Sequence, residues 1–172
     1  MKKIARHETF SLQQPQQLFR NLGNGRFVDA TGQAGAVLKQ PGVGRGAAFG
    51  DIDNDGDTDV VVASDSGPIR LLINHLGSRK HWVGLRVVGR QPRDIVGARV
   101  GIVRATGPTL WRRARADGSY ASANDPRVLV GLGDTARIDK VRVQWPGGNA
   151  EEWTDVPVDR YTTLIEGSGH AK

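Results

Sequence analysis

The stretch GRGAAFGDIDNDGDTDVVVAS, residues 44–64, places five aspartates within nine positions between two apolar runs. The first run is made of small residues and predicts a strand. The second is rich in β-branched valine and predicts a buried strand. Residues 51–59, the acidic loop from here on, therefore connect two strands.

The spacing of the aspartates predicts a site for a hard cation. The first three alternating aspartates converge on one side, Gly56 permits a sharp bend, and the last aspartate returns from beyond it. Unliganded, these carboxylates repel one another, and the alternative is an exposed acidic turn that stays in water. Ca²⁺ accepts six to eight oxygens at variable angles, whereas Mg²⁺ prefers a tighter octahedron. The predicted Ca²⁺ ligands are Asp51, Asp53, Asp55, Asp59 and the main-chain carbonyl of Asp57.

An EF-hand shares the first half of this pattern. Its twelfth position holds a bidentate Glu, but counting from Asp51 that position is Val62. The valines after Asp59 also predict a strand where an EF-hand has its exiting helix. We therefore expect a calcium loop between two strands.

The rest of the N-terminal half predicts further short strands. Residues 16–31 predict a hairpin with Asn24-Gly25 in a type I′ turn, because both residues tolerate positive φ. Residues 69–75 predict another strand, in which LLIN echoes the LFRN found 53 residues earlier. Repeats of short strands at such spacing suggest one to two blades of a β-propeller.

The C-terminal half predicts a second β structure. In KVRVQW, residues 140–145, Val141, Val143 and Trp145 share one face and polar residues share the other. This alternation is typical of an antiparallel sandwich or open barrel. The six expected strands lie in residues 81–89, 98–106, 109–120, 127–133, 140–148 and 160–167.

Charge and aromatic content indicate two domains, residues 1–78 and 79–172. The first has no net charge and contains all four Phe, whereas the second carries the whole +6 together with every Trp and Tyr. The chain has no cysteine, which excludes disulfides and thiolate metal sites. We expect no membrane span, and the opening MKKIARHETF lacks the apolar segment of a signal peptide.

Two families are recognisable in these motifs. The stretch 44–64, with Phe49-Gly50 before the aspartates, resembles an FG-GAP or VCBS repeat of integrin-type β-propellers. The segments from HWVGLRVVG to TDVPVDRYTTLIEG are similar to the ASPIC/UnbV domain, which follows propeller repeats in cartilage acidic protein-like proteins. The resemblance implies an all-β, calcium-binding, extracellular or cell-surface protein with a role in structure or adhesion. It places the calcium ligands on the same five aspartates.

We expect no enzymatic activity. Gly42, Gly44 and Gly46 lack the strand and helix that a dinucleotide fingerprint requires, and neither HExxH nor GxSxG is present. The alternative function is binding of a glycan or another polyanion through arginines such as Arg112, Arg113 and Arg115. We expect no nucleic-acid binding, because the arginines alternate with apolar residues without an aromatic-rich basic run. Unpaired edge strands of a propeller blade favour self-association of an isolated chain. Binding to a protein partner is a further alternative.

Overall fold

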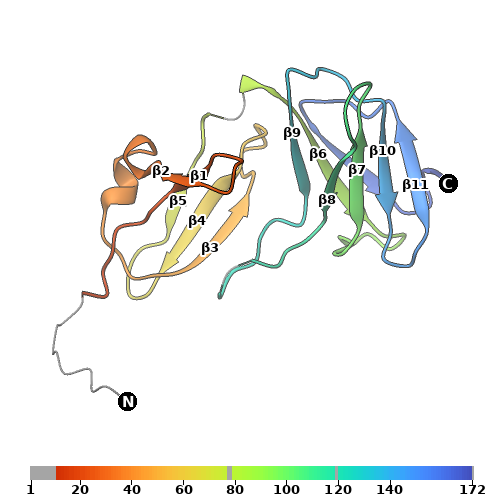
Figure 1. Cartoon of the computed structure of the whole chain (residues 1–172). Helices are drawn as coiled ribbons and strands as arrows, with labels where there is room; N and C mark the ends of the chain where they lie inside the picture. The colour runs from red at the N-terminus through yellow and green to blue at the C-terminus, as the bar shows by residue number, and fades with distance from the viewer. Residues whose placement is uncertain (1–10, 77–78, 119, 172) are drawn as a thin grey trace, which may run out of the picture. The chain divides into compact units, whose positions relative to one another are not determined.

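The computed structural model describes residues 11–76, 79–118 and 120–171, and these divide into two compact units (Figure 1). The first unit is Met1–Gly46 with Val62–Arg70, and the second is Ala47–Val61 with Leu71–Lys172. The boundary expected at 78/79 lies inside the second unit. Residues 77–78 and the N-terminal MKKIARHETF lie outside the described residues. The acidic loop is part of the second unit.

The first unit opens with the expected hairpin. Strands β1 (Phe19–Asn21) and β2 (Phe27–Asp29) pair antiparallel, with Asn21 opposite Phe27. The connection is five residues long, and positive φ occurs at Gly23 and Gly25 but not at Asn24. The predicted type I′ turn is therefore wrong. Asn24 instead uses its side-chain oxygen to accept a hydrogen bond from the Arg26 amide at 3.2 Å.

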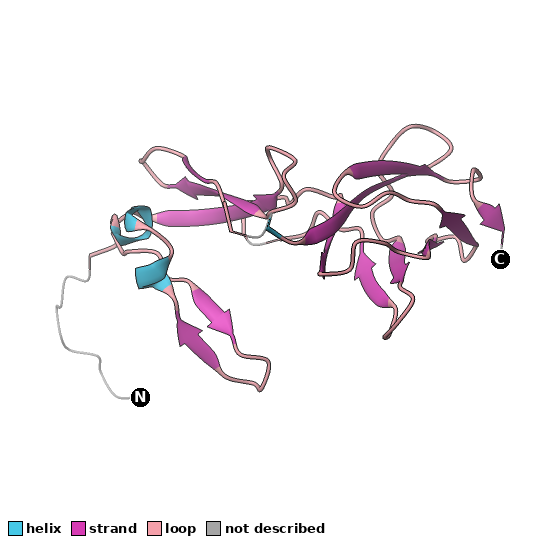
Figure 2. Ribbon diagram, turned by 90° about the horizontal axis from the view of Figure 1, so that it is seen from above, coloured by secondary structure: helices cyan, strands magenta, loops and turns pink. Residues whose placement is uncertain are grey.

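Two 3₁₀ helices follow, η1 (Thr31–Gln33) and η2 (Ala36–Lys39), drawn in cyan in Figure 2. The only buried residue of the pair is Leu38. The Arg70 guanidinium donates to the carbonyls of Gln40 and Pro41 at 2.8 and 2.9 Å. This long side chain ties the segment after η2 to the end of the first unit.

A three-stranded sheet flanks the acidic loop. Its order is β3 (Gly44–Gly50), β4 (Asp59–Ser64), β5 (Arg70–Leu72), and the loop joins β3 to β4. The three strands confirm those predicted from residues 44–64 and 69–75. Residues of β3 and β4 next to the loop belong to the second unit.

The rest of the second unit is a sandwich of two sheets (Figure 1). The five-stranded sheet has the order β13-β11-β10-β7-β8, and the three-stranded sheet the order β12-β6-β9. The strands are β6 (His81–Val88), β7 (Arg99–Val103), β8 (Leu110–Arg113), β9 (Val128–Gly133), β10 (Lys140–Gln144), β11 (Ala150–Thr154), β12 (Tyr161–Ile165) and β13 (His170–Ala171).

The core lies between these two sheets. Val83 and Leu85 of β6 pack in one cluster with Val141 and Val143 of β10, and all four are fully buried. Trp145 is also buried, which confirms the predicted inward face of residues 140–145. The alternation of apolar and polar residues therefore predicted correctly which side chains of this strand face the core.

Two features of the sandwich differ from expectation. Strand β12 pairs parallel to β6, with Tyr161 opposite Gly84, so the sheet is not wholly antiparallel as predicted. Strands β11 and β13 were not among the six predicted strands, because AEEWT and HA show too little apolar alternation to indicate one. No helix among the described residues is long and apolar enough to cross a membrane.

Candidate metal centre

The acidic loop bends sharply at two positions. Asn54 has φ 61° and Gly56 has φ 93°, a left-handed conformation that Asn tolerates and Gly adopts freely. A Cβ atom at Gly56 would lie 2.2 Å from Trp82 Nε1. Gly56 is thus required both for the backbone conformation and for the approach of the Trp82 ring.

The bends bring three carboxylates together. Asp51, Asp53 and Asp59 each place an oxygen within 4.8 Å of the others. Asp51 and Asp59 are buried, with exposed fractions of 3% and 0%, whereas Asp53 is exposed. Two buried carboxylates and one at the surface thus form a site with an opening to solvent.

Main-chain amides fix the two buried carboxylates. Asp51 Oδ1 accepts from the Asp55 amide at 3.1 Å, and its Oδ2 accepts from the Gly56 amide at 2.9 Å. Asp59 Oδ2 accepts from Ile52 at 2.8 Å, and Oδ1 accepts from Asn74 at 2.8 Å. Each carboxylate oxygen has two lone pairs, so both side chains retain acceptor capacity for a further ligand.

The predicted ligands also include the carboxylate of Asp55 and the main-chain carbonyl of Asp57. Asp55 is not in the group of three, and its Oδ1 accepts the Asp57 amide at 2.9 Å. That hydrogen bond lowers the pKa of Asp55, but burial and the carboxylates of Asp53, Asp57 and Asp51 outweigh it and raise the pKa above its usual value. Asp57 is buried. Burial and, after it, the neighbouring carboxylates both disfavour the charged form of Asp55, and a bound cation would offset this cost.

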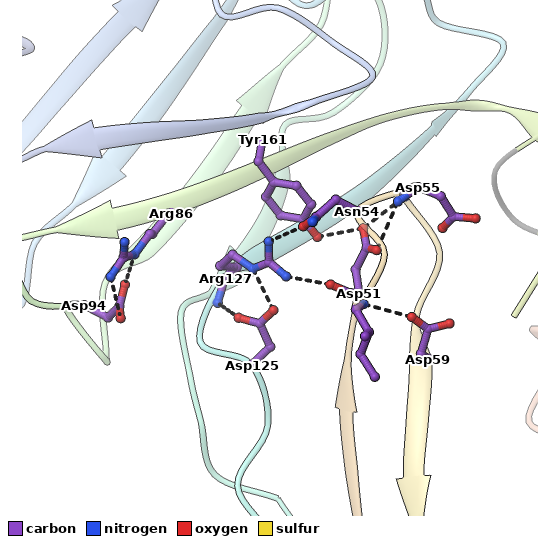
Figure 3. Close-up of polar contacts among 11 residues, drawn as sticks. Asp51, Asn54, Asp55, Asp59, Arg86, Asp94, Asp125, Arg127 and Tyr161 are labelled. Carbon is purple, nitrogen blue, oxygen red and sulfur yellow. Dashed lines mark hydrogen bonds and ion pairs between the residues drawn. The ribbon is translucent and has the colours of Figure 1, made fainter. Parts of the chain in front are cut away.

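Two residues that the sequence did not single out hold the loop in place (Figure 3). Tyr161 Oη donates to Asp51 Oδ2 at 2.9 Å. Arg127 donates from Nη2 to the Asp51 carbonyl and from Nη1 to Asn54 Oδ1, both at 2.6 Å. Burial, followed by the hydrogen bond to Asp51, raises the pKa of Tyr161, so its hydroxyl stays protonated as a donor.

The end of β3, which precedes the acidic loop, is held by residues that lie shortly before β9. Phe49 donates its amide to Asn124 Oδ1 at 3.0 Å and accepts at its carbonyl from the Asp125 amide at 2.9 Å. Asp125 also pairs with Arg127 Nε at 2.6 Å. The acidic loop is therefore anchored at its start as well as at its bend.

The donor set fits a hard cation. Among the described residues, the ion pairs within 4.0 Å involve none of the carboxylates of Asp51, Asp53 and Asp59. Three carboxylates that converge without a cation, two of them desolvated, carry a large repulsive energy. An all-oxygen ligand set of this charge suits Ca²⁺.

Comparison with known families assigns both parts of the chain. Residues 9–62 match the model described as FG-GAP-like repeat, and residues 88–171 match the one described as ASPIC and UnbV. The chain thus carries an FG-GAP-like repeat, a propeller-blade sequence, followed by an ASPIC and UnbV domain, as the motifs predicted. The first match includes the whole acidic loop, which nevertheless packs in the second compact unit.

Two curated relatives are similar over a shorter region. Cartilage acidic protein 1 of Mus musculus and that of Homo sapiens are each 44% identical to this chain over 59 residues. The alignment covers 34% of this chain and 9% of each relative. This chain therefore spans only a small part of the length of these relatives.

Proposed function

We propose that the acidic loop binds one Ca²⁺ and that the chain is a calcium-stabilised structural or adhesion module without catalytic activity. The observation that supports this best is the convergence of Asp51, Asp53 and Asp59, two of them buried, with no ion pair from a basic side chain to their carboxylates among the described residues. The FG-GAP-like match over the loop favours calcium, since repeats of this type often bind it. The main-chain carbonyl of Asp57 and the carboxylate of Asp55 are the further ligands we propose.

Isothermal titration of the chelator-treated chain with Ca²⁺ tests this proposal. We expect one site per chain and a much weaker response to Mg²⁺, which needs a tighter octahedron. Asp59→Asn should abolish or strongly weaken binding, because it removes charge from the most buried ligand. Absence of calcium binding by the wild-type chain would contradict the proposal.

We further propose that the module acts outside the cell and associates with itself through its N-terminal strands. The hairpin β1–β2 is exposed along both strands, with Phe19 and Phe27 54% and 62% accessible. Exposed apolar residues on short strands favour pairing with further strands. Light scattering over a range of concentrations tests this idea, and a strict monomer at high concentration would contradict it. Phe27→Ser should shift the equilibrium toward monomer.

One observation favours polyanion binding as a second candidate function. On the outer face of the five-stranded sheet, Arg99 lies directly opposite Arg113, and the Arg99 guanidinium lies 5.2 Å from the centre of the Trp111 ring. Among the described residues, neither arginine has a carboxylate within 4.0 Å. Opposed like charges destabilise a strand pair, so a bound anion such as an acidic glycan would relieve the repulsion.

Heparin affinity chromatography tests the second candidate. The structure separates the arginines first considered, because Arg112 faces away from Arg113 along the strand and Arg115 lies 3.9 Å from Asp117. Replacing Arg99 and Arg113 together by Ser should therefore reduce heparin retention, whereas Arg112→Ser should reduce it less. Equal retention of the two variants, or loss of retention on chelation alone, would contradict this candidate.

A further inference from the structure

We infer that the sandwich positions the acidic loop for its cation, with Tyr161 and Arg127 as positioning residues that act through Asp51. The inference rests on the proposed calcium site and goes beyond it, because neither residue is a ligand. Tyr161 and Arg127 follow Asp51 by 110 and 76 positions in the sequence. They lie at or next to the first residues of β12 and β9.

The Tyr161 hydroxyl is held in a fixed position. The ring lies over Gly84, where a Cβ atom would be 2.4 Å from Tyr161 Cδ1. The Trp82 ring packs beside the Tyr161 ring, with 5.3 Å between the two ring centres. The same Trp82 ring also packs against Gly56 of the acidic loop. A hydroxyl fixed in this way, donating to Asp51 Oδ2, sets the orientation of that carboxylate.

Arg127 holds the acidic loop through hydrogen bonds to one main-chain and one side-chain oxygen. Two of its nitrogens donate to the Asp51 carbonyl and to Asn54 Oδ1, and its Nε pairs with Asp125. Its guanidinium carbon lies 4.0 Å from the centre of the Tyr161 ring, so the two side chains also support each other. The positive charge is compensated by Asp125, and the predicted ligands keep their own charge for a cation.

Electrostatics and positioning predict opposite outcomes for these residues. A guanidinium close to a cation site repels the cation, and a hydroxyl that donates to a ligand carboxylate draws negative charge from it. If charge alone mattered, removing either group would tighten calcium binding. If the groups act by fixing Asp51, their removal weakens binding, as the loss of an outer-shell hydrogen bond does at other metal sites.

Calcium titration of the full chain distinguishes these outcomes. We expect Tyr161→Phe to raise the Kd about tenfold. The matched control is Tyr120→Phe, which removes the hydroxyl of a tyrosine that is 78% exposed and should leave the Kd unchanged. We expect Arg127→Gln to raise the Kd as well, although it removes a positive charge near the site.

The results separate failure of the inference from failure of the site. Wild-type or tighter affinity in a folded Tyr161→Phe chain, with near-ultraviolet circular dichroism as the fold check, overturns the inference while the calcium site stands. If Tyr161→Phe does not fold, the calcium affinity of Arg127→Gln is the deciding measurement. Unchanged or tighter calcium binding by that variant overturns the inference. A wild-type chain that binds no calcium overturns the proposed site and the inference together.

Discussion

The acidic loop and the surroundings of Glu151 both bury carboxylate groups in the second unit, but they do so in different ways. Glu151 is 7% exposed and accepts hydrogen bonds from Trp145 Nε1 and from the amides of Gly167 and Gly169, at 2.9 to 3.0 Å. The single negative charge of Glu151 is thus stabilised by three hydrogen-bond donors. In the acidic loop, three carboxylates converge, and one oxygen from each lies within 4.8 Å of the other two.

This contrast shows under which conditions a buried acid requires a cation. A single carboxylate is stabilised by well-placed neutral donors, because each charge-assisted hydrogen bond offsets part of its desolvation. Converging carboxylates also repel one another, and neutral donors do not cancel that repulsion. We therefore expect the contribution of Glu151 to stability to be independent of calcium and that of the acidic loop to depend on it.

The largest effect is expected at Glu151. Glu151→Ala leaves three donors without their acceptor and should lower the free energy of unfolding by about 3 kcal/mol. Glu151→Gln keeps one acceptor oxygen and should lose less. Urea unfolding should show equal losses with and without calcium. A loss that changes with calcium would contradict the expected independence of Glu151 from calcium.

A smaller, calcium-dependent effect is expected at Asp53, the exposed member of the loop group. With saturating calcium, Asp53→Ala should lower stability by about 2 kcal/mol, because a ligand of the ion is lost. In chelator the substitution should cost no more than about 0.5 kcal/mol, because removing one of the converging carboxylates also relieves part of their repulsion. Asp139→Ala, at an exposed aspartate outside the loop, is the control. Equal losses at Asp53 under both conditions would contradict the assignment.

The smallest effect is expected at Asp159, a half-exposed carboxylate 2.7 Å from His81 Nδ1. The hydrogen bond with His81 lowers the pKa of Asp159, and the Trp82 amide adds to this. A carboxylate with a lowered folded-state pKa stabilises the fold above its unfolded pKa and loses that contribution as the pH falls through the folded value. Asp159→Asn should therefore cost less than about 1 kcal/mol at pH 7.

The same pH argument gives the control for Asp159. Below the unfolded-state value of about 4, the contribution is lost as the pH falls toward and through the lowered folded-state pKa of Asp159, and the difference between wild type and Asp159→Asn should shrink. Urea unfolding at pH 7 and at pH 3 checks this. A difference that persists or grows at acid pH would show that the carboxylate charge is not its source.

Much of the fold could be predicted because local pattern determines it. Alternation in KVRVQW identified the inward Val141 and Val143, and the valines after Asp59 identified β4. The parallel pairing of β12 with β6 could not be predicted, since partner choice depends on contacts 77 positions apart, such as Tyr161 with Gly84. The hairpin turn was missed because Asn24 bonds through its side chain where positive φ was expected.

The candidate site was predictable only in its local part. The spacing of the aspartates and Gly56 lies within nine residues, and the structure confirms the sharp bend there. Tyr161, Arg127 and Trp82 support the loop from distant strands, and no motif marks them in the sequence. Arg127 and Tyr161 stand at the starts of strands with ordinary alternation, so nothing distinguished them from solvent-facing residues.

The most direct test of the central claim, that the acidic loop holds one Ca²⁺, is thermal unfolding of the wild-type chain in calcium and in EGTA. Calcium at about 100 times its Kd adds about 2.7 kcal/mol to the stability of the bound state. For a chain of this size we expect the Tm to rise by about 5 to 10 °C. Superimposable unfolding curves in calcium and EGTA would contradict the account.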